Sequence, residues 1–301
     1  MTAAFPNAGP VTLRTNLADY PVTRALKSGE IKSDLVRFDF AGPKLAHEGF
    51  KAMVREGRFS AGELAIVTYL QAKHYGKPLA LLPAVVMGRF QHQCIGYNTK
   101  HGTLKPEEIV GRRFGIRSYT QTTGVWIRGV LQHEHGVDPT KVTWVCFEDA
   151  HLAEYCDPPH VERAPTRAKK IEQMLLDGDL DGAIVGALPD DPRVRPLFPD
   201  PIATARDWAP KYGTVPINHL FVVDAELSKT RPDAVQEIYR VLKASKQAAP
   251  PDPSGIDFHP FGATALRKPL ELITQYAFEQ GIVPRKFSVD ELFDETTGKL
   301  D

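Results

Sequence analysis

The feature that most limits the fold of this chain is an alternation of strand-like and helix-like segments that occurs twice along the sequence. In the first block, strand candidates at 11–13, 35–40, 62–67, 79–86 and 93–98 alternate with stretches whose apolar residues recur every three to four positions. Parallel strands need a long crossover between them, which is usually a helix. The order therefore predicts an α/β fold with a mainly parallel sheet.

The second block repeats this pattern from about residue 99. Its predicted elements are strands at 113–117, 142–147 and 180–185 and helices at 123–135 and 168–177. A strand at 217–223 follows, and the helices after it, at 232–248 and 266–278, have no strands of their own. We therefore expect the chain to return to the sheet that it built first.

This return predicts two lobes. One is formed by residues 1–98 together with 219–301, and the other by residues 99–218. Two crossings between the lobes make a two-strand hinge, and a cleft between them is the expected ligand site.

The charge balance and the cysteines narrow the function classes. Lys plus Arg and Asp plus Glu both number 37, so the chain lacks the field that attracts proteins to nucleic acid or anionic lipid. The three cysteines cannot all pair and form no CxxC motif. The first ten residues lack the features of a secretory signal, and no apolar run approaches about 18 residues. We expect a cytoplasmic protein with neither a nucleic-acid nor a membrane partner, and homo-oligomerisation stays open.

Polar side chains follow the predicted strand at 113–117 and begin the next helix. A helix N-terminus binds carboxylate or phosphate well, and threonine hydroxyls, a glutamine amide and an arginine add donors here. The substrate-binding candidates are Arg117, Thr120, Gln121, Thr122 and Thr123. The alternative is that one of the threonines only caps the helix.

A second group of candidates lies between two strands of the first block. Arg89 can bind a carboxylate through two hydrogen bonds, with Phe90 beside it, and His92 is a candidate acid or base. The alternative is that these are solvated surface groups.

Further candidates stand at or near strand ends. Glu148 and His151 form an acid–base pair or a capped helix start, and His219, at the return crossing, faces either the cleft or the core. Glu63 and Arg14 bind substrate or form salt bridges. No HExxH, GxSxG or P-loop motif is present.

Several of these segments together resemble the 4,5-dihydroxyphthalate decarboxylases. The resemblance runs from about Val11 to Phe293, and RSYTQTTGVWIRG is its most specific part. The segments that carry it are GELAIVTYL, GRFQH, GRRFGIRSYTQTTGVWIRGVLQ, PINH and YAFEQG. Gln91 stands where we would expect a second arginine of an R-x-F-R-H run, which leaves the exact substrate open.

The resemblance implies a type 2 periplasmic-binding-protein-like fold, with two α/β lobes, mixed sheets and a two-strand hinge. It also implies non-oxidative decarboxylation of an aromatic dihydroxy diacid to 3,4-dihydroxybenzoate. In the mechanism that we expect, Arg117 and residues 120–123, assisted by Arg89, hold one carboxylate. His92 and His219 serve as acid and base, with Glu148 and His151 as a second choice. No organic cofactor is needed, and a divalent metal is compatible but not required by any ligand spacing.

Two other functions use the same binding groups. A solute-binding protein for an aromatic or small carboxylate would need the carboxylate ligands but no acid–base pair. A related enzyme acting on another ring acid is the second alternative, and Gln91 is the residue that favours it.

Overall fold

The computed structural model describes residues 9–301, which form two mixed β-sheets flanked by helices. The first sheet contains β2 (Val36–Phe40), β1 (Val11–Asn16), β3 (Ala61–Ala65), β11 (Ile217–Asp224) and β4 (Leu79–Gly88), in that order. β1 pairs in parallel with β2 and β3, whereas β11 runs antiparallel to both β3 and β4.

The second sheet contains β10 (Val194–Pro196), β5 (Ile95–Asn98), β9 (Gly182–Ile184), β6 (Arg113–Ile116), β7 (Thr143–Cys146) and β8 (Val161–Arg163), in that order. β6 lies parallel to β7 and β9, and β5 lies antiparallel to β9 and β10. The α/β class is confirmed, and the antiparallel strands make both sheets mixed.

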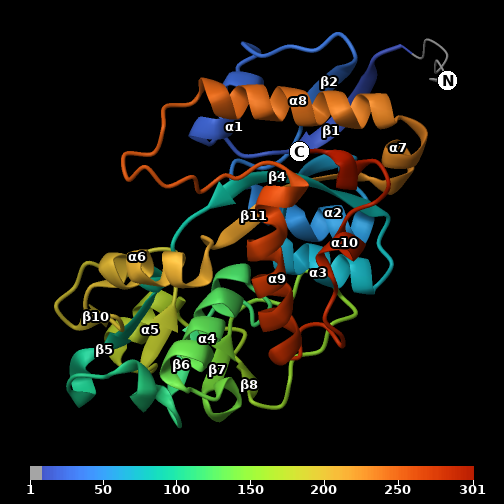
Figure 1. The fold of residues 1–301 in the computed structure, drawn as a ribbon. Coiled ribbons are helices and arrows are strands. Elements are labelled where there is room, and N and C mark those ends of the chain that lie inside the picture. Colours follow the sequence, from blue (N-terminus) through green and yellow to red (C-terminus); the bar gives the residue numbers. More distant parts are fainter. Residues whose placement is uncertain (1–8) are drawn as a thin grey trace.

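Helices connect and cover the strands. They are α1 (Pro21–Lys27), α2 (Phe50–Glu56), α3 (Ile66–His74), α4 (Thr122–His135), α5 (Ile171–Asp177), α6 (Pro201–Tyr212), α7 (Ala225–Thr230), α8 (Pro232–Ala248), α9 (Ala263–Glu279) and α10 (Val289–Leu292). The first sheet with α1 and α8 forms the upper part of Figure 1, and the second sheet with α4, α5 and α6 forms the lower part. α9 packs against both α3 and α4, and so contacts both parts.

The first sheet is buried on both faces because successive side chains of a strand point to opposite sides. In β4, Leu82 and Val86 pack with residues of α8, whereas Leu81 and Val85 pack with residues of α3. The continuous apolar sequence of this strand is what a sheet covered on both faces requires.

The division into lobes at residues 98/99 and 218/219 stays a prediction. β5, at residues 95–98, forms its ladder with β9 and β10 of the second sheet. We therefore propose that the first crossing lies between β4 and β5, a few residues earlier than the sequence pattern places it.

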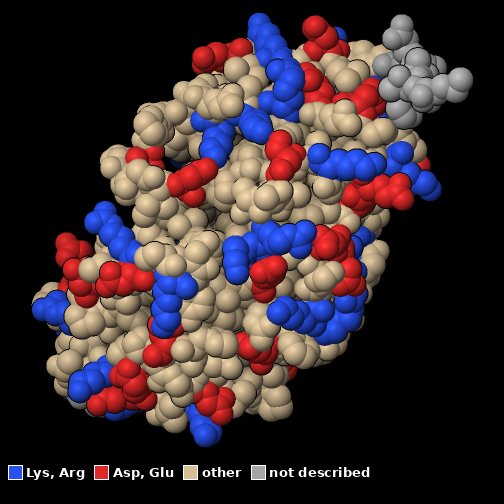
Figure 2. All heavy atoms as spheres, in the orientation of Figure 1, with Lys and Arg blue, Asp and Glu red and all other residues tan. Residues whose placement is uncertain are grey.

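Two surface properties bear on partners and location. Lys and Arg side chains are interspersed with Asp and Glu on the face shown in Figure 2. Within residues 9–301, no helix is both long enough and apolar enough to cross a membrane. The cytoplasmic location, the absence of nucleic-acid and membrane partners and any homo-oligomer stay predictions.

Candidate functional site

A cavity of about 580 Å³ lies where the carboxyl ends of the parallel strands of both sheets meet. In open α/β sheets, ligands bind outside these strand ends. Residues that end or follow β3, β6, β7 and β9 all line the cavity, as do the ends of β4 and β11 nearest the second sheet. The lining residues include His47, Phe50, Ala65, Thr68, Met87, Arg89, Arg117, Gln121, Thr122, Thr123, Phe147, Glu148, His151, Lys169, Lys170, Asn218 and His219.

The first turn of α4 forms one wall of the cavity. The first amides of a helix have no intrahelical acceptor, and no side chain caps this helix at Gln121. The Thr122 hydroxyl accepts a hydrogen bond from the Val67 amide of α3, and the Thr123 hydroxyl accepts one from Asn218 (both 3.4 Å). This wall therefore offers donors and a partial positive charge to an anion.

Cationic side chains add full charge to this wall. Arg89 and Arg117 both line the cavity, and the Nε of each is enclosed without a hydrogen-bond partner among the described residues. Arg117 Nε lies 3.8 Å from the carboxylate of Glu148, and Lys170 also lines the cavity. The excess of cations over anions suits a ligand with carboxylate groups.

His219 reaches the cavity from β11 and is held from behind by a carboxylate. Its Nδ1 lies 2.7 Å from Glu63 Oε2, and its side chain is 14% exposed. The ring of Phe50 meets the His219 ring edge-on at 5.1 Å. Nδ1 is thus occupied by Glu63, which leaves Nε2 as the nitrogen that can serve a ligand.

His151 also packs against Phe50, whose ring it meets edge-on at 5.5 Å. Its Nδ1 is 2.7 Å from the Thr68 hydroxyl. Burial, with the positive charges of Arg117 and Lys51, lowers the pKa of His151 to about 3. This imidazole is therefore neutral near pH 7, so it can exchange hydrogen bonds with a ligand but carries no spare proton.

Among the lining residues that were not sequence candidates, His47 and Asn218 bear most directly on the site. His47, from the short turn before α2, faces the cavity, and burial and the charge of Arg117 lower its pKa below the usual value. Asn218 precedes His219 and accepts a hydrogen bond from Gln91 (2.7 Å). The position of Asn218 at the start of the return strand is a signal that sequence analysis can use. His47 has none.

His92 is not part of the cavity lining. Its ring packs edge-on against Phe198 (5.2 Å) and Trp208 (6.1 Å), and neither ring nitrogen has a hydrogen-bond partner among the described residues. The loop that was expected to present it is a 3-10 helix turned toward the core. We therefore remove His92 from the catalytic candidates.

The burial of His92 predicts a pH-dependent stability. Burial, with a smaller effect of His135, lowers its pKa from 6.5 to about 4. As the pH falls below about 6.5, the unfolded chain takes up this proton before the folded chain does, so stability falls until about pH 4. Between pH 7 and 4.5, wild type should lose about 2 to 3 kcal/mol more unfolding free energy than His92→Phe. Urea unfolding at both pH values measures this, and equal losses in the two proteins would contradict it.

Four other predicted residues also lie outside the cavity lining. Arg14 is exposed on β1, and Phe90 is buried edge-on against Phe258. Thr120 is buried with its hydroxyl 3.3 Å from that of Ser118. Glu63 is fully buried behind His219. We withdraw direct substrate contact for these four, because none of them reaches the space that a ligand would fill.

The remaining candidates come together around the cavity. They are Arg89, Arg117, Gln121, Thr122, Thr123, Glu148, His151 and His219. Within residues 9–301, no group of three or more His, Cys, Asp or Glu side chains is arranged to hold a metal ion. That no organic cofactor is needed stays a prediction, as does the compatibility of the site with a divalent metal.

Sequence comparison finds two curated relatives with the same name. The 4,5-dihydroxyphthalate decarboxylase of Comamonas testosteroni is 25% identical over 253 residues, which cover 77% of this chain and 74% of that protein. The protein of that name from Pseudomonas putida is 28% identical over 213 residues, or 66% of this chain and 81% of that protein. No family model matches the chain. The resemblance to this group is thus confirmed at a distant level of identity.

Solved structures show the fold. The aliphatic sulphonate binding protein of Escherichia coli matches with a TM-score of 0.61 and 10% identity, covering 94% of this chain and 97% of that chain. The alkanesulfonate-binding protein of Xanthomonas axonopodis pv. citri, bound to MOPS, matches with a TM-score of 0.56 and 12% identity. The match covers 95% of this chain and 99% of that chain. A desulfurization enzyme matches with a TM-score of 0.50 and 15% identity, covering 94% of this chain and 97% of that chain. The periplasmic-binding-protein-like fold is confirmed, and since it occurs in binding proteins and in an enzyme, it does not decide the function.

Proposed function

We propose that this chain is a carboxy-lyase that removes CO2 from 4,5-dihydroxyphthalate or a closely related hydroxylated aromatic acid, giving 3,4-dihydroxybenzoate in the first case. The observation that carries the proposal is His219, backed by a buried carboxylate and facing a cavity lined by two arginines. A binding protein needs the arginines, whereas an imidazole held in this way is suited to proton transfer. The names of the two relatives supply the substrate.

The chemistry requires protonation before CO2 leaves. Direct loss of CO2 would leave an aryl anion, which is too unstable. A hydroxyl lies para to each carboxylate of 4,5-dihydroxyphthalate, so its electron density can support a new C–H bond at the carbon bearing the carboxylate. The C–C bond to the carboxylate then breaks, its electrons restore the aromatic ring, and CO2 departs. One proton replaces one CO2.

The residues of the cavity divide these tasks. Arg117, Arg89 and the first turn of α4 bind the carboxylate that remains. His219 delivers the proton to the ring carbon from Nε2. The neutral imidazole of His151 accepts a hydrogen bond from the substrate hydroxyl and so directs its electron density into the ring. The substrate hydroxyl serves as the electron source, and the proposal uses no cofactor.

The direct test mixes purified protein with 4,5-dihydroxyphthalate. We expect stoichiometric CO2 and 3,4-dihydroxybenzoate, measured by headspace analysis and chromatography, with one proton taken up per turnover. A panel of hydroxylated benzoates and phthalates tests the related-acid alternative. Tight binding in calorimetry without any product would overturn the enzyme proposal and favour the solute-binding alternative.

Arg117→Met tests the carboxylate contact. The guanidinium lines the cavity, and a charge-assisted hydrogen bond contributes about 1.5 to 3 kcal/mol. We expect KM to rise about 10- to 100-fold. Arg112→Met is the matched control, because that side chain lies near Asp181 before β6, at the strand end away from the cavity. Equal KM values for both variants would remove Arg117 from the site.

A further inference from the structure

We infer that Glu63 is a positioning residue for His219, which fixes the tautomer and the orientation of its ring, and that Tyr20 supports it. This inference rests on the proposed function for its kinetic part only. Glu63 does not touch the cavity, and any effect on a ligand passes through the imidazole.

The carboxylate of Glu63 is held at both oxygens. Oε1 accepts a hydrogen bond from the amide of Ala18 (2.7 Å), and Oε2 accepts from the hydroxyl of Tyr20 (3.0 Å) and from His219 Nδ1 (2.7 Å). The residue is 0% exposed. Three donors converge on a group that can only accept, which is how a buried carboxylate is satisfied.

This arrangement selects one tautomer of the neutral imidazole. Because an ionised carboxylate accepts only, Nδ1 of His219 must carry the hydrogen, and Nε2 is left with a free lone pair on the cavity side. Nε2 can then take a proton and pass it to a ligand. The opposite tautomer would present an N–H that cannot take up a proton.

The backbone fixes the place of each partner. β3 and β11 are antiparallel neighbours in which Glu63 pairs with Phe221 and Ala65 with His219. Tyr20 and Ala18 follow β1, which approaches β3 closely at Gly62. Gly62 has φ +148, and a Cβ there would lie 2.2 Å from the carbonyl oxygen of Asn16.

Tyr20 acts as a permanent donor. Burial, followed by the charge of Glu63, raises its pKa well above the usual value, so the phenol keeps its proton at any working pH. Its hydrogen bond holds Oε2 on the side of the histidine. Removing this hydroxyl should therefore loosen the carboxylate without changing the charge of the site.

Glu63→Gln tests the tautomer without substrate. If the amide oxygen keeps the Ala18 bond, the NH2 group replaces Oε2 and donates to His219 Nδ1, which moves the ring hydrogen to Nε2. We expect ¹⁵N spectra of histidine-labelled protein, at a pH where the ring is neutral, to show an Nδ1–H tautomer in wild type and an Nε2–H tautomer in the variant. The His219 signal is assigned by its loss in His219→Gln. An Nε2–H tautomer in wild type, or no change in the variant, overturns the inference whether or not the protein is a decarboxylase.

The kinetic arm uses the same variants. With 4,5-dihydroxyphthalate, Glu63→Gln should lower kcat about 10²- to 10⁴-fold and leave KM within about twofold, because it changes the proton and not the carboxylate contact. Tyr20→Phe should lower kcat about tenfold and shift the His219 Nδ1 resonance. If Glu63→Gln does not fold, Tyr20→Phe provides the test in its place. Tyr69→Phe is the matched control, since it removes a buried hydroxyl bonded to the Leu292 carbonyl (2.7 Å). If Glu63→Gln changes the tautomer of His219 but leaves kcat unchanged, the tautomer does not matter for the reaction and the catalytic part of the inference is wrong.

Discussion

His219→Gln is expected to lower kcat for 4,5-dihydroxyphthalate about 10²- to 10⁴-fold, the usual contribution of a general acid or base. Glutamine is close to histidine in size and can still hydrogen-bond to Glu63, so folding should be retained. It cannot carry a proton to a ring carbon. Steady-state rates of product formation, with circular dichroism to check the fold, measure the effect.

His133→Gln is the matched control for this variant. His133 also contacts a carboxylate, that of Glu279 at 2.7 Å, but it lies at the other end of α4 and not on the cavity. Its replacement should leave kcat unchanged. A His219→Gln enzyme with a rate close to wild type would show that another group delivers the proton.

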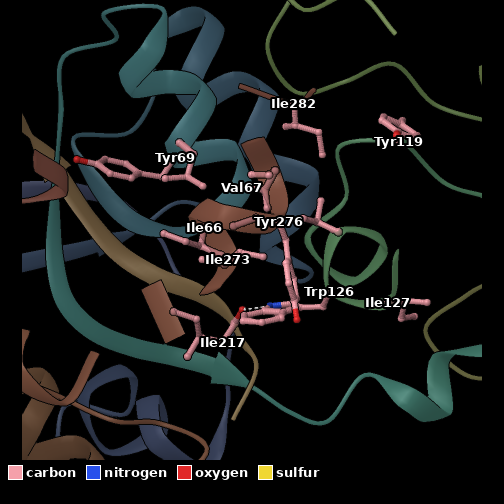
Figure 3. Close-up of a cluster of buried hydrophobic side chains, with 14 of the residues drawn as sticks. Ile66, Val67, Tyr69, Tyr119, Trp126, Ile127, Ile217, Ile273, Tyr276 and Ile282 are labelled. Atoms are coloured by element: carbon pink, nitrogen blue, oxygen red, sulfur yellow. Dashed lines mark hydrogen bonds between the residues drawn. The ribbon is translucent and has the colours of Figure 1, made fainter. Parts of the chain in front are cut away.

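Trp126→Ala is expected to give the largest loss of stability, about 3 to 5 kcal/mol of unfolding free energy. The side chain is fully buried in α4 and donates a hydrogen bond to the carbonyl of Ile217 in β11 (2.8 Å; Figure 3). Its ring meets those of Trp208 and Tyr276 edge-on. The variant loses this packing, leaves a cavity and removes the indole hydrogen bond to that carbonyl. Urea unfolding followed by circular dichroism measures the change.

Trp126→Phe separates the two contributions. It keeps an aromatic ring but loses the N–H, so its cost should be smaller than that of the alanine variant. A cost below about 1 kcal/mol for Trp126→Ala would mean that the core collapses to fill the space. The helix and strand joined by this side chain carry the Thr122–Thr123 wall and His219, so the test also probes what holds the two walls of the cavity together.

Strong periodicity made some elements predictable. The helix predicted at 232–248 is α8, with proline at its first position, and the strand predicted at 79–86 is β4 with two residues added. The segment 62–67 was predicted as one strand, but β3 ends at Ala65 and α3 begins at Ile66. A short apolar run looks the same in a buried strand and in a buried helix, so the sequence does not show where one ends.

The direction of a strand was harder to predict from the sequence than its position. β11 and β5 are antiparallel to their neighbours, and periodicity says nothing about direction. The edge strands β8 and β10 were not predicted, because their sequences, VER and VRP, contain no apolar run.

The same reasoning explains the site. Arg117, Glu148 and His219 all line the cavity, as expected when the ends of strands meet, which is a property of topology. His92 does not line the cavity, because its ring packs against Trp208, and a contact so far along the chain cannot be inferred from the local sequence. His47 reaches the cavity from a turn with no strand to mark it.

The close contact between β1 and β3 restricts how such sequences can diverge. Residue 62 admits no side chain without pushing Asn16 aside, and the next residue is the carboxylate behind His219. A side chain at residue 62 would shift the strand that carries Glu63, so the pair Gly62–Glu63 should be inherited as a unit. A distant homologue that keeps this dipeptide together with a histidine on the returning strand is therefore a candidate for the same chemistry. One that has lost only the glycine would need a differently built sheet.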